Sequence, residues 1–255
     1  IALALYFLRA SGRETREARL RVSFVNQVSH ELKTPLTNIR LYAELLEGHL
    51  GDDDPKSTRF LKVIVGESRR LSRLIGNVLS FGRQQRRSLQ LQPSPASVDR
   101  VIDEVLEIFA PSLNEHGITV EREGSAPRDV LLDADALEQI LGNLISNVEK
   151  YASAGGFLGL AVSQEAARST IDVHDRGPGI PARQRRRVFR PFYRVSSKLS
   201  DGVAGTGIGL TIARELARQH QGDLQLVPDA STTGARFRVT LWTPEVVQAD
   251  RGGEP

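Results

Sequence analysis

The chain has 255 residues, of which 40% are hydrophobic and 25% are charged, as in an ordinary globular protein of one or two domains. It contains no cysteine, which excludes disulfide bonds and thiolate metal sites. The net charge of +3 does not indicate nucleic-acid binding. The arginine-rich run Arg183 to Arg190 lacks the alternation of basic and aromatic side chains of a stacking surface, so we expect a solvated helix face there and no nucleic-acid partner.

The first eight residues, Ile1 to Leu8, are apolar, and arginines follow them. Eight residues cannot span a bilayer, which requires ~20. Two interpretations stand: the cytoplasmic end of a membrane helix, whose inner flank is typically basic, or the apolar start of a coiled helix. We favour the first. We therefore expect residues 1–22 to be a membrane-proximal signalling helix, and the chain to be the cytoplasmic portion of an inner-membrane protein.

Residues 23–90 are predicted to form a helical hairpin. Apolar residues recur at steps of three and four from Val25 to Leu50, Gly51 to Pro55 breaks the pattern, and a second, nearly heptad stripe follows from Phe60 to Phe81. Two such helices leave an apolar seam exposed, whereas two hairpins together bury it in a four-helix bundle. The sequence therefore predicts a homodimer.

A Pro- and Ser-containing linker, Gln90 to Ser97, is predicted to flex near Pro93 to Pro95 and to separate the hairpin from a second domain at residues 91–245. Helical and strand patterns mix in this domain, which indicates an α+β layer of helices on one sheet. Residues 246–255 are polar and predicted to be a flexible tail. The expected helices cover 98–113, 136–152 and 208–219, and the expected strands cover 118–123, 130–133, 157–163, 169–175, 224–227 and 235–242.

His30 lies on the first predicted helix, about 200° around the axis from Val28 in the apolar stripe. Thr34 and Asn38 follow at one and two turns along the same outward face. A neutral imidazole is a nucleophile near neutral pH, and a carboxylate that holds its other ring proton, here Glu31, orients it. A lone exposed histidine is more often incidental, so this face alone does not identify a function.

The segment Phe24 to Leu36, FVNQVSHELKTPL, resembles the phospho-acceptor box of the largest class of sensor histidine kinases, and its His-Glu-x-x-x-Pro core matches in full. The resemblance implies that His30 is phosphorylated, that Glu31 is the general base and that Thr34 assists a phosphatase reaction on a partner receiver. Pro35 falls inside the predicted helix, where proline costs ~3 kcal/mol and kinks the backbone. It is either a hinge beside His30 or a simple irregularity.

A second constellation lies in the helix predicted at residues 136–152. Asn143 and Asn147 are four residues apart and share a face, with Lys150 three residues on. Amide oxygens suit Mg²⁺ and a lysine neutralises phosphate, although a polar helix face is the commoner meaning of such a pattern. The segment resembles the Asn box of the same kinases. The resemblance implies Mg²⁺ at Asn147 and a nucleotide beside Lys150 and Tyr151, and we expect Asn143 to line the same site.

The turn from Asp175 to Ile180, DRGPGI, ends a predicted strand. A carboxylate there can accept a hydrogen bond from the exocyclic amine of adenine, whereas guanine presents an oxygen. Gly177 and Gly179 allow the backbone to approach a ligand closely. Turns of this composition are common, but this one predicts an adenine site at Asp175.

A glycine-rich segment opens the helix predicted at residues 208–219, where backbone N–H groups favour phosphate. Residues 196–204 before it look like a loop rather than a strand, which favours a nucleotide lid over a dinucleotide fold. Upstream, Phe189 to Arg194 resembles the Phe-rich box before the lid of these kinases, which implies that Arg194 reaches the γ-phosphate. The nucleotide-binding residues expected from the glycine-rich segment are Gly205, Thr206, Gly207, Gly209 and Leu210.

These motifs occur in family order, and the resemblance covers about residues 20 to 242. It implies an α+β protein in which a dimeric helical hairpin, forming a four-helix bundle, precedes an α/β-sandwich ATP-binding domain. It also implies ATP and Mg²⁺ as cofactors, autophosphorylation on His30, and transfer of the phosphoryl group to an aspartate of a response-regulator receiver. Two departures stand out: Val148 replaces a small residue, and Gln221 replaces a glycine of a His-Gly-Gly turn.

Two other functions were weighed. An ATP hydrolase of the gyrase, mismatch-repair and chaperone superfamily typically carries a glutamate four residues before the Mg²⁺-binding asparagine, and here Asn143 occupies that position. A degenerate kinase that only scaffolds a regulator is disfavoured by the intact Asn147, Asp175 and lid glycines. The sequence therefore favours a protein-histidine kinase.

Overall fold

The computed structural model describes residue 28 and residues 32–46, 55–85, 90–195, 206–228 and 233–246. The chain divides into two compact units, residues 1–82 with 204–207 and residues 83–203 with 208–255. Among the described helices, none is both long and apolar enough to span a bilayer. Several predicted features lie outside the described residues: the segment 1–22, His30, Glu31, most of the lid with Gly205, and the tail after residue 246.

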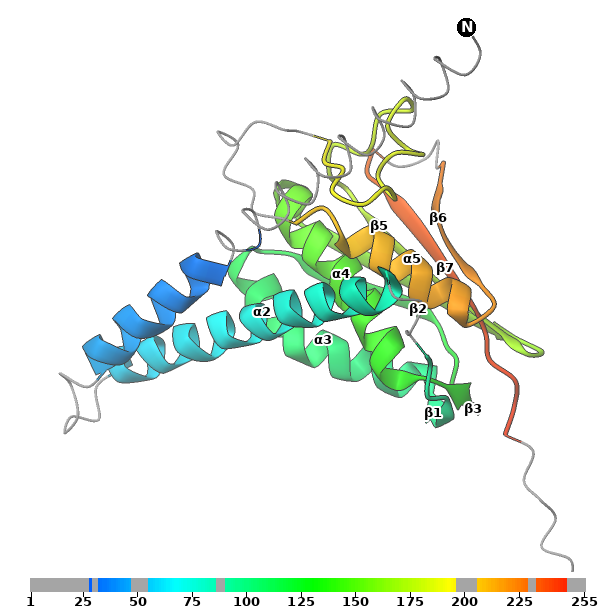
Figure 1. Cartoon of the computed structure of the whole chain (residues 1–255), viewed down its shortest axis with the longest axis horizontal. Coiled ribbons are helices and arrows are strands. Elements are labelled where there is room, and N and C mark those ends of the chain that lie inside the picture. The colour runs from blue at the N-terminus through cyan, green and yellow to red at the C-terminus, as the bar shows by residue number, and fades with distance from the viewer. Residues whose placement is uncertain are drawn as a thin grey trace, which may run out of the picture. The chain divides into compact units, whose positions relative to one another are not determined.

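The first unit contains two antiparallel helices, which lie side by side in Figure 1. One covers residues 32–46, and the other, α2, covers Pro55–Gln85. The rings of Tyr42 and Phe60 meet between them at a centroid distance of 5.7 Å. The predicted helical hairpin is therefore confirmed in the described part of the chain.

Polar residues of the hairpin differ in part from their predicted positions. Thr34 is exposed, as expected, but Asn38 is half-buried, and its Nδ2 donates to Oε1 of Glu67 on α2 at 3.3 Å. The prediction that Asn38 shares the outward face is thus wrong, because Glu67 makes one seam position between the helices polar. The backbone stays helical on both sides of Pro35, whose side chain is buried.

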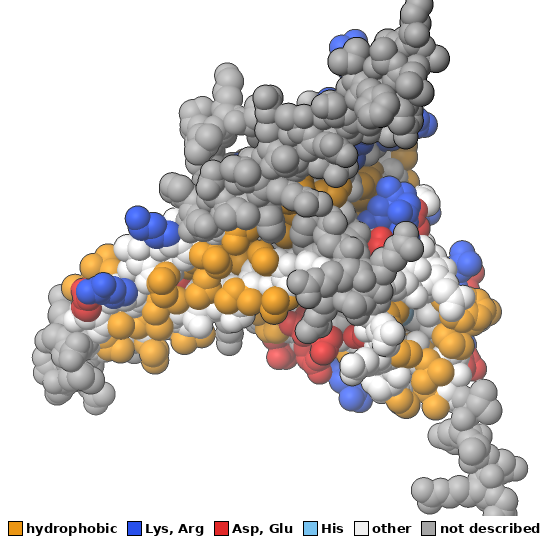
Figure 2. All heavy atoms as spheres, in the orientation of Figure 1, with side chains coloured by type: hydrophobic (Ala, Val, Ile, Leu, Met, Phe, Trp, Pro, Cys, Tyr) orange, Lys and Arg blue, Asp and Glu red, His pale blue; other side chains and the backbone are white. Residues whose placement is uncertain are grey.

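The hairpin leaves much of its apolar surface uncovered in a single chain. Leu36 is 59% exposed although it belongs to the predicted apolar stripe. Figure 2 shows these orange side chains spread over the hairpin. A continuous apolar surface of this kind marks a contact with another protein surface. Its exposed members are Leu36, Leu41, Leu45, Leu61, Val65, Ile75 and Leu79.

The second unit is a five-stranded mixed sheet with three helices on one side (Figure 1). The strand order is β2-β4-β5-β7-β6; β2 and β4 are parallel, and the other pairs are antiparallel. Alternate strand residues, such as Leu160, Val173 and Val239, are buried, as expected of a sheet covered on one face. This agrees with the predicted α/β sandwich. The helices are α3 (Val98–Glu115), α4 (Ala134–Tyr151) and α5 (Gly209–Gln219), and the strands are β2 (Thr119–Gly124), β4 (Phe157–Glu165), β5 (Arg168–Asp175), β6 (Asp223–Val227) and β7 (Arg236–Trp242), with a 3-10 turn at Ser153–Gly155.

A small second sheet corrects the predicted linker. β1 (Ser94–Ser97) pairs antiparallel with β3 (Asp129–Leu132), so the segment expected to flex near Pro93 to Pro95 is partly a strand. Sequence reasoning missed it because proline and serine are poor strand formers, yet proline is tolerated at a sheet edge. The chain also returns to this sheet, because Glu245 bridges Val130 on the other edge of β3 and the Leu131 N–H donates to the carbonyl of Pro244 at 2.9 Å.

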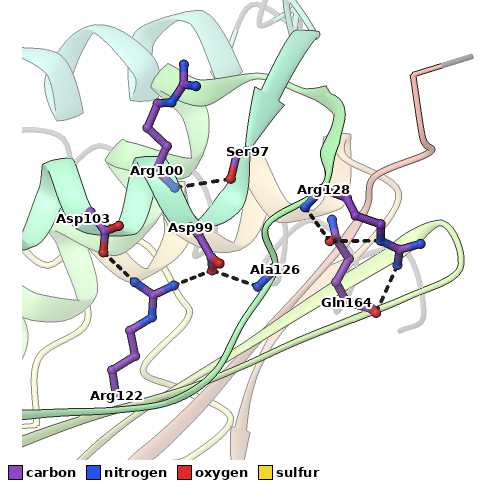
Figure 3. Close-up of polar contacts among 8 residues, drawn as sticks. All are labelled: Ser97, Asp99, Arg100, Asp103, Arg122, Ala126, Arg128 and Gln164. Atoms are coloured by element: carbon purple, nitrogen blue, oxygen red, sulfur yellow. Dashed lines mark hydrogen bonds and ion pairs between the residues drawn. The ribbon is translucent and has the colours of Figure 1, made fainter. Parts of the chain in front are cut away.

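An ion-pair cluster ties α3 to β2. Arg122 of β2 donates to the carboxylates of Asp99 and Asp103, and Asp99 also accepts the Ala126 N–H at 2.8 Å (Figure 3). Nearby, the Arg128 side chain contacts Gln164 of β4. These contacts fix the loop between β2 and β3 against the sandwich.

The arginine-rich run differs from its prediction, since residues 182–190 form consecutive turns rather than a helix. Val188 is buried in it, and the Phe189 ring meets Phe237 of β7 edge-on at 6.3 Å. Two apolar anchors therefore hold the segment to the sheet while Arg183 and Arg186 remain exposed.

Candidate functional site

Helix α4 carries the predicted asparagine pair on a partly open face. Asn143 and Asn147 are both half-buried, and Nδ2 of Asn143 donates to the carbonyl of Gln139 at 2.9 Å, which fixes its side chain. Lys150 is half-buried and Tyr151 is 47% exposed in the last turn. Both amide side chains and the lysine are therefore held on a rigid helix but remain reachable.

Asp175 ends β5 and is 7% exposed. Its Oδ1 accepts the N–H groups of Gly177 at 2.8 Å and Ala235 at 3.1 Å, which holds the carboxylate in one orientation. Among the residues that the structure describes, no donor hydrogen-bonds to Oδ2. A carboxylate oxygen is a strong hydrogen-bond acceptor, so Oδ2 is suited to an N–H donor of a ligand.

The glycines of this turn are required by close packing. A Cβ on Gly177 would lie 2.5 Å from Cβ of Ala152 at the end of α4. A Cβ on Gly234 would lie 1.7 Å from the Asp175 carbonyl. Gly179 has a φ of 68°, in the left-handed region that favours glycine. Side chains are thus excluded around Asp175, and backbone lines the site.

The glycine-rich segment meets α4 farther along. Gly209, the first residue of α5, lies against Asn143, because a Cβ there would sit 2.8 Å from Oδ1 of Asn143. No side chain caps the start of α5, and Ile208 is its N-cap residue. The first N–H groups of such a helix lack intrahelical acceptors and favour an anion. Of the other predicted residues, Thr206 is buried, Gly207 has a φ of 69° and Leu210 is half-buried.

Two motifs that are far apart in sequence therefore pack on helix α4, which itself carries the asparagine pair. Gly177 packs on Ala152 at its C-terminal end, and Gly209 packs on Asn143 nine residues earlier, about 13 Å along the axis at 1.5 Å per residue. The turn after Asp175 and the start of α5 thus meet α4 at two places, with Asn147 between them in the sequence of the helix.

The Phe-rich box holds the start of α5. The Thr211 hydroxyl donates to the carbonyl of Phe189 at 3.1 Å, and the guanidinium of Arg214 stacks over the Phe189 ring at 4.7 Å. Arg214 in turn pairs with Asp223 of β6 at 2.8 Å. Arg194, predicted to reach the γ-phosphate, is half-buried in the segment that follows.

The turn after α5 explains one departure from the family pattern. Gln221 has a φ of 54°, so a non-glycine residue occupies a left-handed position there. A Cβ on the next residue, Gly222, would lie 1.7 Å from the Thr240 carbonyl. The close approach therefore requires glycine at position 222 but not at position 221.

These residues fit a magnesium nucleotide. Asp175 offers an acceptor for adenine, α5 offers N–H groups for phosphate, and Asn147 offers an amide oxygen for Mg²⁺. The described residues hold no cluster of three or more His, Asp or Glu side chains suited to a metal. Mg²⁺ in nucleotide sites keeps several waters and shares substrate phosphates, so one amide ligand from the protein suffices.

Comparison with known proteins agrees with this geometry. Residues 132–245 match the family described as histidine kinase-, DNA gyrase B- and HSP90-like ATPase, and residues 20–87 match the His Kinase A phospho-acceptor domain. The two matches together cover well over half of the chain. The chain belongs to the sensor histidine kinase family. Residue 30 falls inside the phospho-acceptor match, and Asn147 and Asp175 fall inside the ATPase match.

Among sensor histidine kinases, the chain is 33% identical to WalK of Bacillus subtilis over 80% of its length and 31% identical to SenX3 of Mycolicibacterium smegmatis over 95%. It spans 34% and 62% of those two relatives. The solved structure of full-length ShkA in complex with AMPPNP is 25% identical, with a TM-score of 0.60 over 88% of this chain and 46% of that one. The histidine kinase AdeS of Acinetobacter baumannii, at 22% identity and a TM-score of 0.56 over 84% and 97% of the two chains, shares the fold.

Sequence reasoning singled out neither Asp133 nor a structural role for His220. Asp133 is the N-cap of α4, and its backbone N–H donates to Nε2 of the buried His220 at 3.2 Å. The capping rule could have found Asp133, because an aspartate directly before a periodic apolar helix is a typical N-cap. The contact with His220 joins residues 87 positions apart and leaves no local pattern.

Proposed function

We propose that this chain is the cytoplasmic core of a sensor histidine kinase that transfers the γ-phosphoryl group of ATP to its own His30. The observation that carries the proposal is the convergence on α4, where Gly209 packs on Asn143 and Gly177 packs on Ala152. This arrangement leaves one face for adenine, Mg²⁺ and phosphates, in that order along the helix.

In the proposed nucleotide complex, Asp175 Oδ2 accepts from the adenine amine and the backbone at Gly177 and Gly179 lies along the base. Asn147 coordinates Mg²⁺, with Asn143, Lys150, Tyr151 and Arg194 around the ribose and phosphates. The lid residues Gly205, Thr206, Gly207, Gly209 and Leu210 enclose the phosphates at the start of α5. When bound at Asn147, Mg²⁺ would supply positive charge to neutralise the phosphates during transfer.

The transfer step uses the hairpin. An imidazole nitrogen of His30 forms a bond to the γ-phosphorus, the bond from that phosphorus to the β–γ bridging oxygen breaks, and ADP leaves. Glu31 accepts the proton from the other ring nitrogen or holds it as the imidazolium forms. The phosphoryl group then passes to an aspartate of a response-regulator receiver. The exposed Thr34, one turn from His30, supports a further role in removing phosphate from that receiver.

The assembly we propose is a homodimer whose hairpins, residues 23–90, form a four-helix bundle. The exposed apolar surface of the hairpin, with Leu36, Leu61 and Leu79 among its members, supports this assembly. The ATP-binding domain then comprises residues 91–245, and residues 246–255 form a tail that follows it. We propose that the preceding segment 1–22 connects the core to a membrane anchor.

An ATP hydrolase of the related superfamily is the second candidate function. Its water-activating base is replaced here by Asn143, whose side chain packs on Gly209 and bonds to Gln139. An amide has no basic lone pair at neutral pH, so hydrolysis is disfavoured against transfer to His30.

The test is incubation with γ-labelled ATP and Mg²⁺, followed by acid and base treatment. We expect an acid-labile, base-stable label that His30→Gln abolishes. His49→Gln, which changes the other histidine of residues 23–90, is the matched control and should label normally. A label that survives His30→Gln would contradict the assignment, and phosphate release without a labelled intermediate would favour the hydrolase.

A further inference from the structure

Asp133 joins three segments of the chain: α4, the interdomain linker and the residues that follow α5. Its Oδ1 accepts the Ala136 N–H at 2.9 Å and caps α4, and its Oδ2 accepts the Gln92 N–H of the interdomain linker at 2.7 Å. Its own backbone N–H donates to Nε2 of His220 after α5 at 3.2 Å. Each carboxylate oxygen therefore serves a different segment of the chain.

The His220 side of this junction is fixed in one tautomer. Because Nε2 accepts from Asp133, the ring proton resides on Nδ1, which donates to the carbonyl of Leu216 at 3.2 Å. His220 is 5% exposed, so burial holds the ring in place. The N-cap of the nucleotide helix α4 is thus tied to the end of the lid helix α5 as well as to the linker.

The linker is consequently held before β1 begins at Ser94. Gln92 is bonded to Asp133, and Ser94 is already paired with Leu132, so the ATP-binding domain is continuous with the linker from Gln92 onward. This linker is also the covalent path that connects the hairpin with α4. The Asp133 carboxylate therefore ties the linker to the start of α4 two residues before the β1–β3 pairing begins.

We propose that Asp133 is a positioning residue for phosphoryl transfer: by binding the linker with one oxygen and capping α4 with the other, it holds the linker at Gln92 in a fixed relation to the nucleotide-binding helix α4. This rests on the proposed function. Asp133 contacts neither nucleotide nor histidine in this proposal and acts through the linker and α4. Loss of the linker bond should therefore lower the rate of transfer at saturating ATP and leave nucleotide affinity unchanged, because transfer depends on orientation and binding does not.

Two substitutions break the same hydrogen bond from opposite sides. Asp133→Asn keeps one oxygen to cap α4, since asparagine caps as well as aspartate, but its amide nitrogen cannot accept from Gln92. Gln92→Pro removes the donor and leaves Asp133 intact. Asp135→Asn, an exposed change of the same charge two residues away, is the matched control.

The experiment measures three quantities in the dimeric chain: amide exchange at Gln92, ADP affinity, and the rate of His30 labelling at saturating ATP. We expect Asp133→Asn to remove protection at Gln92 and to slow labelling about fivefold, the population change that one net hydrogen bond supports, with ADP affinity within about twofold of wild type. Gln92→Pro should slow labelling equally, and the double variant should be no slower than either single variant. Asp135→Asn should match wild type.

Any one of three results would overturn the positioning role. They are unchanged protection of the Gln92 amide in Asp133→Asn, additive effects of the two substitutions, and a loss of ADP affinity in Asp133→Asn that parallels the loss of labelling. Asp133→Ala is the control for loss of the α4 cap, because alanine cannot accept the Ala136 N–H. It should lower the melting temperature, whereas Asp133→Asn should not. Failure of the wild-type chain to label would instead contradict the proposed function. That outcome is distinguishable from failure of the positioning role because it needs no variant.

Discussion

Gly209 packs on Asn143 so closely that a methyl group at position 209 would lie 2.8 Å from the asparagine side-chain oxygen. The first residue of α5 and the middle of α4 are therefore in direct contact. One carries the start of the proposed phosphate site and the other carries the asparagine pair, so a side chain added at position 209 would disturb both parts of the proposed site.

Gly209→Ala should weaken ATP binding by about tenfold, equivalent to ~1.4 kcal/mol, because the new methyl group displaces Asn143 or the start of α5. Isothermal titration with ADP and Mg²⁺ measures this change. Gly142→Ala is the control on the same helix: its Cβ would meet only the Phe109 ring, at 3.8 Å. It should leave affinity unchanged and stabilise α4 by up to ~1 kcal/mol. Equal affinity in both variants would refute the contact's role in binding.

Asp175→Asn should weaken adenine nucleotide binding by about 100-fold, since it removes a charge-assisted hydrogen bond worth ~1.5–3 kcal/mol and presents an amide donor to the adenine amine. Discrimination between ATP and GTP, measured by competition with a fluorescent nucleotide, should fall at the same time. Asp172→Asn is the companion variant. Asp172 lies three residues earlier and is paired with Arg236 and Arg238, so its loss should lower stability without changing nucleotide choice.

The pair of Arg214 and Asp223 predicts acid sensitivity. The hydrogen bond from Arg214 lowers the pKa of Asp223 from 3.8 to about 2. Since the folded state then binds fewer protons than the unfolded state, the stabilisation is complete above about pH 5 and is lost as pH falls toward 2. Because solvent screens this partly exposed pair, Asp223→Asn should lower the free energy of unfolding by about 1 kcal/mol at pH 7 and by less at pH 3. Urea titrations at the two pH values measure this. Arg218→Ala, which removes a more exposed partner 3.2 Å from Asp223, should cost less than about 0.5 kcal/mol.

His220 predicts a second pH effect in a different range. Burial lowers its pKa below the ordinary 6.5, outweighing the opposing effects of the Leu216 carbonyl and Asp133. The folded state thus excludes a proton that the unfolded state binds, so stability is complete above about pH 6.5 and declines as pH falls below it. His220→Gln should remove this part of the pH dependence of the melting temperature between pH 7 and 5. The exposed His116 supplies the reference substitution, and an identical slope in His116→Gln and His220→Gln would argue against the assignment.

Much of the sandwich could be predicted because its elements carry strong local periodicity. The helices around Asn143 and Thr211 and the strand ending at Asp175 were expected within about two residues of their ends. β1 could not be predicted, because its pairing with Leu132 comes from a partner more than thirty residues away and not from its own composition. The prediction that Asn38 faces outward was wrong for a similar reason: its polar partner, Glu67, lies on the other helix of the hairpin.

The sequence predicted which residues form the candidate site, but it did not predict which of them pack against each other. The sequence indicated close approach at Gly177 and a phosphate site at Gly209, but only the structure shows that these glycines pack on Ala152 and Asn143. The capping rule could have found the contact of Asp133 with Ala136, but its contacts with the Gln92 N–H and with His220 join distant parts of the chain and leave no local pattern. Contacts of that kind depend on tertiary structure alone.

The small sheet around β3 has a consequence for how such domains can be rearranged. β1, the first strand of the second unit, lies along one edge of β3, and the segment with Pro244 and Glu245 lies along the other. Both ends of the ATP-binding domain thus pair with the same four-residue strand, Asp129–Leu132. A domain closed in this way is a self-contained cassette, which recombination could graft behind a different hairpin without unravelling its sheet.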